Sequence, residues 1–489
     1  MRFAREGGLT ITTILAVIFF IWRLDFGWPL ISLWNPLRTL IFYVPAPTER
    51  EPPNFDALLR QARSTVSELW RLNAAQFPPT HRNSSSVVRL NLLLSQATHQ
   101  LAARLSLLDK LSDQRERRER QLDALGSELK HQIARLQNPP DCSPSHVSLE
   151  DGRFNCGFGC TAHHVAYRLA RAYATNRTLM LEHDYGNDFF LPLSNCSKAQ
   201  IESAKPNGQR YCPMHPQEWA KRLNEIQGNP IAWYRGHLLS YILRPRDAVL
   251  RRRLEIEMQT LRTGRNGNPY DGPIAGIHVR RTDKIFVEAT FHPLGEYMLH
   301  VERFFEVKEI EYCLETGTSS PPFWSQRRRV FLASDDASVF DEARSNYPRY
   351  EFIGGLRKGS EYETRRSTTG VFAITLDINL LVASDFVVCT ATSNICRLVY
   401  ELFLAKPQVH GDATFQVQSV DEIYQRYFTL RRWWRAIADL KQKGIKLGDT
   451  IPISSTLWDG FVRTAPTILA PQETSLPAYL FQEIVQTVE

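Results

Sequence analysis

The sequence predicts a doubly wound α/β core, preceded by a helical segment and followed by a small module of strands. Short apolar runs alternate with helical stretches from about residue 140 to 430, the pattern of parallel strands joined by helices. A heptad repeat of leucines precedes this region, and short turn-rich strands follow it. The length of 489 residues allows two or three domains, each with its own core.

Composition and charge exclude several classes of protein. With 43% hydrophobic and 23% charged residues, 25 Gly and 28 Pro, the chain is not collagen-like, wholly disordered or a polytopic membrane protein. An excess of 59 Lys and Arg over 52 Asp and Glu suits anionic partners. The arginine runs at 115–120, 251–253 and 327–329 are each explained as solvated faces, so no nucleic-acid partner is predicted.

An uncharged apolar stretch near the amino end predicts a membrane anchor over residues 9–24. Arg2 and Arg5 precede it, so residues 1–8 are expected in the cytosol. A cleaved signal peptide is the alternative, but no small-residue cleavage site follows closely. The rest of the chain would lie in an oxidising lumen, where cysteines pair. Three sequons could accept glycans there: Asn83, Asn176 and Asn195.

Residues 25–137 predict a stem that contains a coiled coil. Leucines spaced by three and four residues form one seam between Leu90 and Leu136, and a shorter amphipathic helix is expected over residues 55–72. Arg115 and Arg118 fall in the seam, which predicts loose packing in its middle. A simple helical spacer and a dimerising coiled coil both fit this pattern, and we favour the second.

The region over residues 138–430 contains the predicted α/β core. Its buried parallel strands are expected at 178–182, 276–280, 329–334 and 385–389, and its helices at 164–175, 292–311 and 338–347. In such a fold, ligands bind at the carboxyl ends of the strands. Functional residues should therefore follow the strands directly.

Residues 431–489 predict a small β-barrel. Its short strands and turns are expected at 436–440, 446–452, 458–460 and 476–479. In order they resemble an SH3 domain, with an Ala-Leu-x-Asp-like start, a Leu-x-x-Gly-Asp-x-Ile turn, a central Trp and a Pro-x-Tyr end. The stretch from Arg463 to Ser475 fits that pattern poorly.

A cluster of cations follows the strand at 276–280 and predicts an anion site. Arg280, Arg281 and Lys284 lie at the end of a buried strand, where positive charge is costly unless an anion compensates it. The guanidinium fork suits a phosphate, and a departing diphosphate needs fixed positive charge. Glu288 and His292 follow within a few residues and supply acid/base groups. A surface basic cluster paired with acids is the alternative.

Asp335 and Asp336 follow the next predicted strand. A carboxylate clamp for a metal-bound diphosphate usually reads Asp-x-Asp, and this segment does not. Because fixed cations are already present, no metal is predicted. The alternative role is helix N-capping, since a helix is expected to begin at Ser338.

These segments resemble the core signature of the α-1,6-fucosyltransferases, the Golgi enzymes that add core fucose to N-glycans. The resemblance rests on the sequence HVRRTDK at 278–284, followed by Glu288, Phe-His-Pro at 291–293 and Tyr297. Further segments keep the family order at 156–164, 332–336, 376–378 and 389–397. The likeness covers residue 140 to the end and includes the succession of anchor, coiled-coil stem, GT-B-like core and SH3 domain.

The resemblance implies a single activity. L-Fucose would pass from GDP-β-L-fucose to the 6-hydroxyl of the innermost Asn-linked GlcNAc of N-glycans, with inversion and without metal or other cofactor. The partners implied are GDP-fucose, N-glycan acceptors on glycoproteins and the Golgi membrane. We expect a single-pass type II protein with a lumenal catalytic domain, and a homodimer formed through the stem and the SH3 domain.

The resemblance also implies roles for individual residues. Arg280 should hold the β-phosphate, and Arg365 should close over the nucleotide. Glu288 is the candidate general base for the acceptor hydroxyl, with Lys284 beside it. The other donor-site residues implied are Arg281, nearby or structural, His278 and Asp377, both facing the guanosine, and Asp283, Tyr297, Asp335, Asp336 and Ser393.

The family pattern implies three disulfides: Cys142–Cys196, Cys156–Cys160 and Cys389–Cys396. A fourth family pair is missing at both of its positions. Cys212 and Cys313 remain, and their pairing is open. A zinc site made of Cys156, Cys160, His163 and His164 is the disfavoured alternative, because the spacing is crowded and the lumen is oxidising.

Two other functions compete with this one. A non-enzymatic Golgi adaptor would use the coiled coil and the SH3 module for binding, but it requires a degraded site, and Arg280, Lys284, Glu288 and Asp377 are all present. A fucosyltransferase acting on protein hydroxyls is the second, and those enzymes lack the stem and SH3 combination. The divergent segments at 196–233 and 463–475 leave acceptor preference open.

Overall fold

The computed structural model describes residues 55–76, 85–183, 189–197, 217–223, 226–246, 248–263, 267–287, 289–360, 364–406, 413–421, 432–456, 460–464 and 474–484. All of these belong to one unit of the chain. The predicted anchor at 9–24 lies outside the described residues. Among the helices within the described ranges, none is long and apolar enough to cross a membrane.

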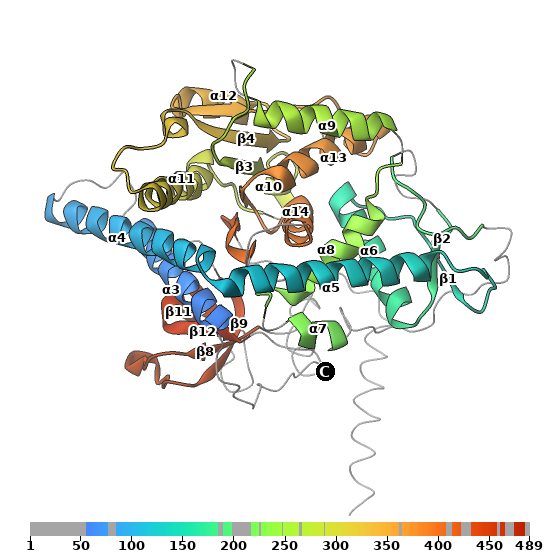
Figure 1. The fold of residues 1–489 in the computed structure, drawn as a ribbon, viewed down its shortest axis with the longest axis horizontal. Helices are drawn as coiled ribbons and strands as arrows, with labels where there is room; N and C mark the ends of the chain where they lie inside the picture. Colours follow the sequence, from blue (N-terminus) through green and yellow to red (C-terminus); the bar gives the residue numbers. More distant parts are fainter. Residues whose placement is uncertain are drawn as a thin grey trace, which may run out of the picture. The chain divides into compact units, whose positions relative to one another are not determined.

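The described residues contain a five-stranded parallel sheet, of which β3 and β4 are labelled in Figure 1. Its strands, in spatial order, are β5 (Tyr350–Ile353), β4 (Arg328–Ser334), β3 (Ile274–Val279), β6 (Phe386–Cys389) and β7 (Val417–Ser419). The chain runs outward from β3 to β4 and β5, then returns to β6 on the other side of β3. The direction of winding therefore reverses between β3 and β6, which is the point where doubly wound sheets bind ligands.

Helices cover both faces of this sheet, because neighbouring side chains of each strand point to opposite sides. Ala275, Ile277 and Val279 of β3 pack in one core with α11 (Leu294–Thr316) and α12 (Ser338–Asn346). On the other face, Ile274 shares a core with α13 (Thr368–Ala383) and α14 (Asn394–Leu404). α9 (Ala248–Arg262) packs on α13, and the short α10 (Lys284–Val287) follows β3.

A second group of elements shares the core of the α13 and α14 face. It contains the parallel pair β1 (Val147–Glu150) and β2 (Thr178–Leu181) and four helices: α5 (Asp113–Gln137), α6 (Phe158–Ala174), α7 (Gln217–Leu223) and α8 (Pro230–Ile242). α8 starts at a Pro, and its N-cap Asn229 accepts a bond from the Ala232 amide. It is buried on almost every side, so it is the central helix of this group.

The predicted leucine seam is divided between two helices. α4 (Ser85–Lys110) ends before Ser112, which caps α5 by accepting from the Gln114 amide. The seam leucines of α5, such as Leu125 and Leu129, are buried in the core, whereas those of α4 are exposed. The stem leucines therefore do not form one continuous interface.

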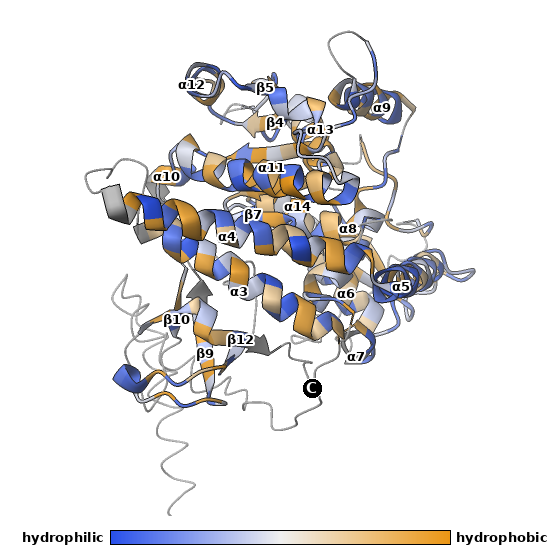
Figure 2. Ribbon diagram, turned by 60° about the vertical axis from the view of Figure 1, so that its left-hand side comes forward, coloured by the Kyte–Doolittle hydropathy of each residue, from blue (hydrophilic) through white to orange (hydrophobic). Residues whose placement is uncertain are grey.

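The prediction of loose packing at Arg118 was wrong. This side chain is 2% exposed and lies between Asp56 of α3 (Phe55–Gln76) and Asp109 of α4, with the Asp109 oxygen 2.7 Å from Nη2. α3, α4 and α11 run side by side (Figures 1 and 2). A buried ion pair therefore joins α3 to the junction between α4 and α5.

The carboxyl-terminal region contains a five-stranded antiparallel sheet. Its spatial order is β11 (Ser475–Pro477), β10 (Phe461–Thr464), β9 (Thr450–Thr456), β8 (Arg432–Ala436) and β12 (Phe481–Ile484). The strand expected at 436–440 instead ends at Ala436, and the expected central Trp458 lies outside the described residues. Short 3₁₀ helices lie at 323–326, 413–415, 441–443 and 478–480; the last, η5, packs on α3.

Candidate active site

Three loops that follow neighbouring strands meet at the carboxyl edge of the parallel sheet. The loop after β3 touches the loop after β4, because the Arg281 amide donates to Asp335 Oδ1 at 2.9 Å. Tyr297 of α11 hydrogen-bonds Thr390 in the loop after β6. The structure thus gathers the predicted donor-site residues of three separate segments at the switch between β3 and β6.

Arg280 is surrounded by acceptors. Its guanidinium donates to Thr282 Oγ1 at 2.7 Å and to Asp283 Oδ1 at 2.5 Å, and it forms an ion pair with Asp335. Asp283 also accepts two bonds from Arg365, at 2.8 and 3.1 Å. Burial raises the pKa of Asp283, but the bonds from Arg365 and Arg280 outweigh this and lower it to about 2.

Two guanidinium groups suited to a diphosphate, Arg280 and Arg365, are held together by one ionised carboxylate. Thr282 adopts a positive φ of 41°, which a β-branched residue rarely does. The backbone therefore turns sharply where the Asp283 carboxylate is presented to both arginines.

Arg281 has a structural position. It is 6% exposed, donates to Glu342 of α12 at 2.9 Å and lies 3.5 Å from Asp336. Its guanidinium stacks 4.7 Å from the Phe291 ring. Arg281 therefore anchors the loop after β3 to α12, and Glu342, which no sequence motif distinguished, completes this contact.

The two consecutive aspartates have different roles. Asp336 Oδ1 accepts from the Ser338 amide at 2.9 Å and from its hydroxyl at 2.7 Å, but the N-cap residue of α12 is Ala337, which makes no side-chain capping bond. Burial raises its pKa, but the bonds from Ser338 and the charge of Arg281 lower it overall. Asp335 instead binds the loop after β3. Asp336 therefore binds the first turn of α12, and Asp335 binds the loop after β3.

The amino end of α14 faces the same edge of the sheet. Ser393, 4% exposed, is its N-cap residue, and the preceding loop follows β6 directly. Arg397 donates to the Ala391 and Thr392 carbonyls at 2.8 and 3.0 Å, and Asp421 accepts the Ala391 amide at 2.7 Å. The loop is thus held rigid beside a helix end whose dipole favours anions.

Asp421 was missed by the sequence analysis. It follows β7 and accepts from Ala391, Thr392 and Ser419. The only signal available was its position after a short strand, β7, which the apolar pattern did not reveal. Asp421 positions the loop after β6, and it belongs to no motif that the sequence analysis recognised.

The two residues expected to face guanosine, His278 and Asp377, are both buried. His278 is 4% exposed, and burial, followed by the charge of Arg280, lowers its pKa to about 3, so the ring is neutral. Asp377 of α13 accepts from Arg357 Nε at 2.6 Å, and Arg357 also contacts Glu257 at 3.3 Å. Burial raises the pKa of Asp377 to about 6, although Arg357 opposes this.

The acid/base residues are described only in part. Glu288, the candidate base, lies outside the described residues. Lys284 begins α10, and its carbonyl accepts the Ala289 amide at 3.1 Å. His292 Nδ1 lies 2.7 Å from Glu296 Oε2. Tyr297 is 1% exposed, and burial raises its pKa above the usual range, so its hydroxyl stays neutral.

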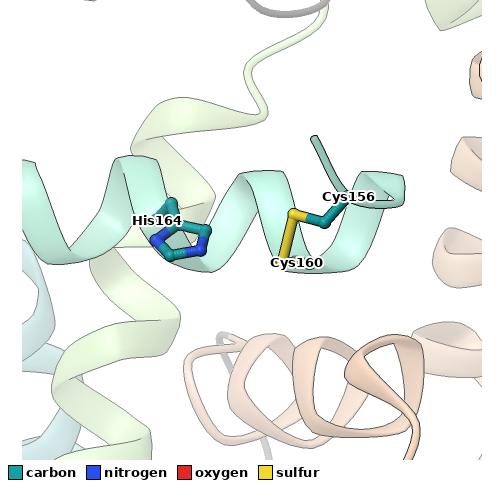
Figure 3. Close-up of side chains that lie close together, drawn as sticks. All are labelled: Cys156, Cys160 and His164. Atoms are coloured by element: carbon teal, nitrogen blue, oxygen red, sulfur yellow. A yellow bond between two sulfur atoms is a disulfide. The ribbon is translucent and has the colours of Figure 1, made fainter. Parts of the chain in front are cut away.

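All three expected disulfides are present: Cys142–Cys196, Cys156–Cys160 and Cys389–Cys396. Figure 3 shows the Cys156–Cys160 bond beside His164 on α6. Because the two sulfurs bond each other, neither is a thiolate that could hold zinc, and the zinc alternative is wrong for this structure. His163 instead contacts the buried Glu401 at 2.7 Å. Cys313 is in the thiol form, and Cys212 lies outside the described residues.

Two of the three sequons can be located. Asn176 and Asn195 are both exposed, and Asn83 lies outside the described residues. Asn176 occupies the turn after α6 with a φ of 52°. Their modification stays a prediction.

Comparison with known proteins identifies the family. A family model described as the α-(1,6)-fucosyltransferase N- and catalytic domains matches residues 46–209 and 200–425. An α-(1,6)-fucosyltransferase of Drosophila melanogaster is 30% identical over 495 residues, covering 91% of this chain and 76% of the relative. One of Caenorhabditis elegans is 28% identical over 444 residues, covering 82% and 74%. The crystal structure of the fucosyltransferase NodZ from Bradyrhizobium is 16% identical, with a TM-score of 0.30, and covers 53% of this chain and 93% of NodZ. The family model spans most of the chain, and the fly relative agrees with it, so the chain is a glycosyltransferase that belongs to the α-(1,6)-fucosyltransferase family.

Proposed function

We propose that the protein transfers L-fucose from GDP-β-L-fucose to the 6-hydroxyl of the innermost Asn-linked GlcNAc of N-glycans. The observation that carries this proposal is the convergence of Arg280, Arg365 and the amino end of α14 at the switch point of the parallel sheet. Two guanidinium groups and the amino end of a helix together suit a diphosphate best. Family membership supplies the transferred sugar and the linkage.

The proposed mechanism is a one-step displacement without metal. Arg280 and Arg365 exchange the Asp283 carboxylate for the β-phosphate and stabilise the charge that develops on GDP as its bond to the sugar breaks. The acceptor oxygen attacks the anomeric carbon from the opposite face, which inverts it, and its proton passes to Glu288. The neutral His278 adds a hydrogen-bonding group without adding charge.

The replacement of Glu288 by Gln tests the proposed base. A base contributes about 10²–10⁴-fold, so kcat should fall by that factor while GDP still binds. The assay incubates the full chain with GDP-fucose, a GlcNAc-terminated biantennary N-glycan and EDTA, and reads product mass and linkage. Glu255→Gln is the matched control, because Glu255 is an exposed residue of α9 that pairs with Arg252. Binding of GDP without transfer by the unmodified protein would instead support the adaptor function.

We also propose a homodimer formed through α4. The exposed side chains of Leu90, Leu94, Leu101 and Leu108 follow heptad spacing, with exposed fractions of 42–68%. Such a stripe on one helix is the pattern that pairs with a second copy. The α5 half of the seam is already buried within the same chain, which confines the proposed contact to α4.

The location and the terminal module complete the proposal. A type II anchor at 9–24 would place the described residues in the Golgi lumen, and the two exposed sequons and three disulfides support a lumenal environment. The five antiparallel strands after residue 431 support the SH3-like assignment. Cleavage of residues 50–489 by protease added outside intact Golgi vesicles would contradict this orientation.

A further inference from the structure

A cavity lies at the edge of the parallel sheet opposite the candidate active site. Its volume is about 630 Å³, within the usual range for small-molecule sites. Pro273, Phe386 and Gln416, at or just before the amino ends of β3, β6 and β7, line it together with residues of α3, α4, α11 and α14. The six residues of β3 separate it from Arg280 by roughly 20 Å. It is therefore distinct from the donor site.

Seven basic and five acidic side chains line this cavity, and most of the basic ones are neutralised. Arg63 pairs with Asp109 and Arg262 with Asp385, and the other ion pairs are Arg115–Glu119, Lys110–Glu311, Lys110–Glu315 and Lys308–Glu311. Arg303 and Lys406 are the exceptions. Across the described ranges, neither forms an ion pair with a carboxylate.

The partners of these two cations are neutral. Arg303 donates to the Ser67 hydroxyl at 3.1 Å and stacks 4.5 Å from the Trp70 ring. Lys406 donates to the Val382 carbonyl at 3.2 Å and lies 5.5 Å from the Phe403 ring. Glu68 acts on Arg303, and Asp385 on Lys406, only by charge, because Glu68 pairs with Arg71 and Asp385 with Arg262.

Both cations are consequently poorly compensated. Burial, followed by the charge of Arg71, lowers the pKa of Arg303 to about 9, and burial also lowers the pKa of Lys406. Removing a charge from water costs free energy that a hydroxyl or a carbonyl recovers only in part. An anion in the cavity would recover more of it.

Aromatic rings form much of the remaining wall. Phe304 of α11 stacks on Phe386 at the start of β6, with ring centroids 4.7 Å apart, and Trp324, Phe403 and Tyr312 also line the cavity. Such surfaces favour the flat face of a ring. The cavity thus combines two under-compensated cations with apolar walls.

We propose that this cavity binds a small organic anion, in which a sulfate, phosphate or carboxylate group is carried on an aromatic or sugar ring. The anionic group contacts Arg303 or Lys406, and the ring packs on the aromatic wall. Because α3, α4, α11 and the sheet edge share the cavity, the bound anion joins the helical segment to the core and raises the temperature of unfolding.

Calorimetric titration of the full chain tests the proposal. Two ligands carry the anionic group on a ring: benzenesulfonate on an aromatic ring and N-acetylglucosamine 6-sulfate on a sugar ring. Inorganic sulfate is the anion without a ring, and N-acetylglucosamine is the ring without an anion. At least one ring-borne anion should bind at about 1 mM or tighter, in the presence of saturating GDP as well as in its absence. Which of the two binds identifies the ring. Failure of both, displacement by GDP, or equal binding of the neutral sugar would overturn the proposal.

Matched variants locate the site. Whichever of Arg303→Gln and Lys406→Gln removes the cation that contacts the anionic group should weaken binding about tenfold, the effect expected for the loss of one charged hydrogen bond. Lys308→Gln removes a charge from the same cavity wall, but Lys308 is already paired with Glu311, so binding should be unchanged. GDP binding checks that each variant folds. Equal affinity in all three variants, or equal weakening in all three, would contradict the assignment of Arg303 and Lys406.

Discussion

At the scale of single residues, the cations of the candidate site are held by carboxylates. Asp283 holds Arg280 and Arg365, and Asp377 holds Arg357. The family resemblance implied donor roles for Arg280, Arg365, Asp283 and Asp377, and these roles stay predictions. Arg357 was not predictable, because its partnership with Asp377 and Glu257 joins segments up to 100 residues apart.

The pKa of Asp377 predicts how donor binding depends on pH. Since its pKa is about 6, the carboxylate is ionised above that pH and protonated below it. If Asp377 accepts the guanine N–H groups, the Kd for GDP should be flat above pH 7 and rise about tenfold per unit below pH 6. Calorimetric titration between pH 5 and about 8 measures this.

Asp377→Asn is the control for that profile, and its Kd for GDP should lose the dependence near pH 6. Asp283, with a pKa of about 2, does not titrate in this range. Unfolding through Asp377 does not explain weaker binding at low pH, because a raised folded-state pKa means that protonation of this group favours the folded state. An unchanged profile in Asp377→Asn would contradict the guanosine role.

At the scale of elements, buried ion pairs fix the loops and helix junctions. Sequence patterns predicted the strands and helices well where apolar runs were long, as in β4 and α11. They failed for β7, with three residues, and for the seam of α5, because heptad spacing does not distinguish a second chain from the core of the same chain.

The loop after β6 depends on one carboxylate, which predicts the effect of Asp421→Asn. The amide side chain keeps the size but loses the charge that accepts the Ala391 and Thr392 amides. The KM for GDP-fucose should rise about tenfold, with a smaller change in kcat, since the loop still forms but is less fixed.

Steady-state kinetics with Asp439→Asn as the control checks this prediction. Asp439 accepts the Leu447 amide between β8 and β9 and so makes a similar loop contact outside the parallel sheet. An equal rise in KM in both variants would point to general destabilisation instead of loop positioning.

Arg118→Ala should destabilise the fold strongly. The substitution leaves the buried carboxylate of Asp109 and the half-buried one of Asp56 without this cation, which typically costs about 3–5 kcal/mol. Arg120→Ala removes an exposed pair with Glu116 and should cost at most about 0.5 kcal/mol. Urea unfolding measures both, and similar values for the two variants would disprove the role of Arg118 in the junction.

At the scale of the whole molecule, the order of motifs along the chain was sufficient to predict an α/β core with the site at its carboxyl edge. The relation of α3 and α5 to that core was not predictable, because it depends on which apolar face meets which neighbour after folding. The only sequence feature that indicated this packing was the interruption of the leucine seam by Arg115 and Arg118.

The exposed stripe of α4 predicts the oligomeric state. Leu101→Glu combined with Leu108→Glu should convert a dimer to a monomer, because two charges would face the apolar stripe of the second copy. Sedimentation velocity reads the mass directly. Leu92→Glu, exposed but off the heptad stripe, should leave the mass unchanged. A monomeric unmodified protein would refute the dimer.

The position of α3 has a consequence for the synthesis of this chain. Arg71 of α3 bonds Gln418 of β7, 347 residues further along, and η5 packs on α3 from later still. At 5–20 residues per second, α3 is exposed for roughly 17–70 s before these partners emerge from the ribosome. A nascent chain with Trp70 and Leu59 uncovered for that time is a client for chaperones. Truncation before η5 would leave α3 without its carboxyl-terminal contact.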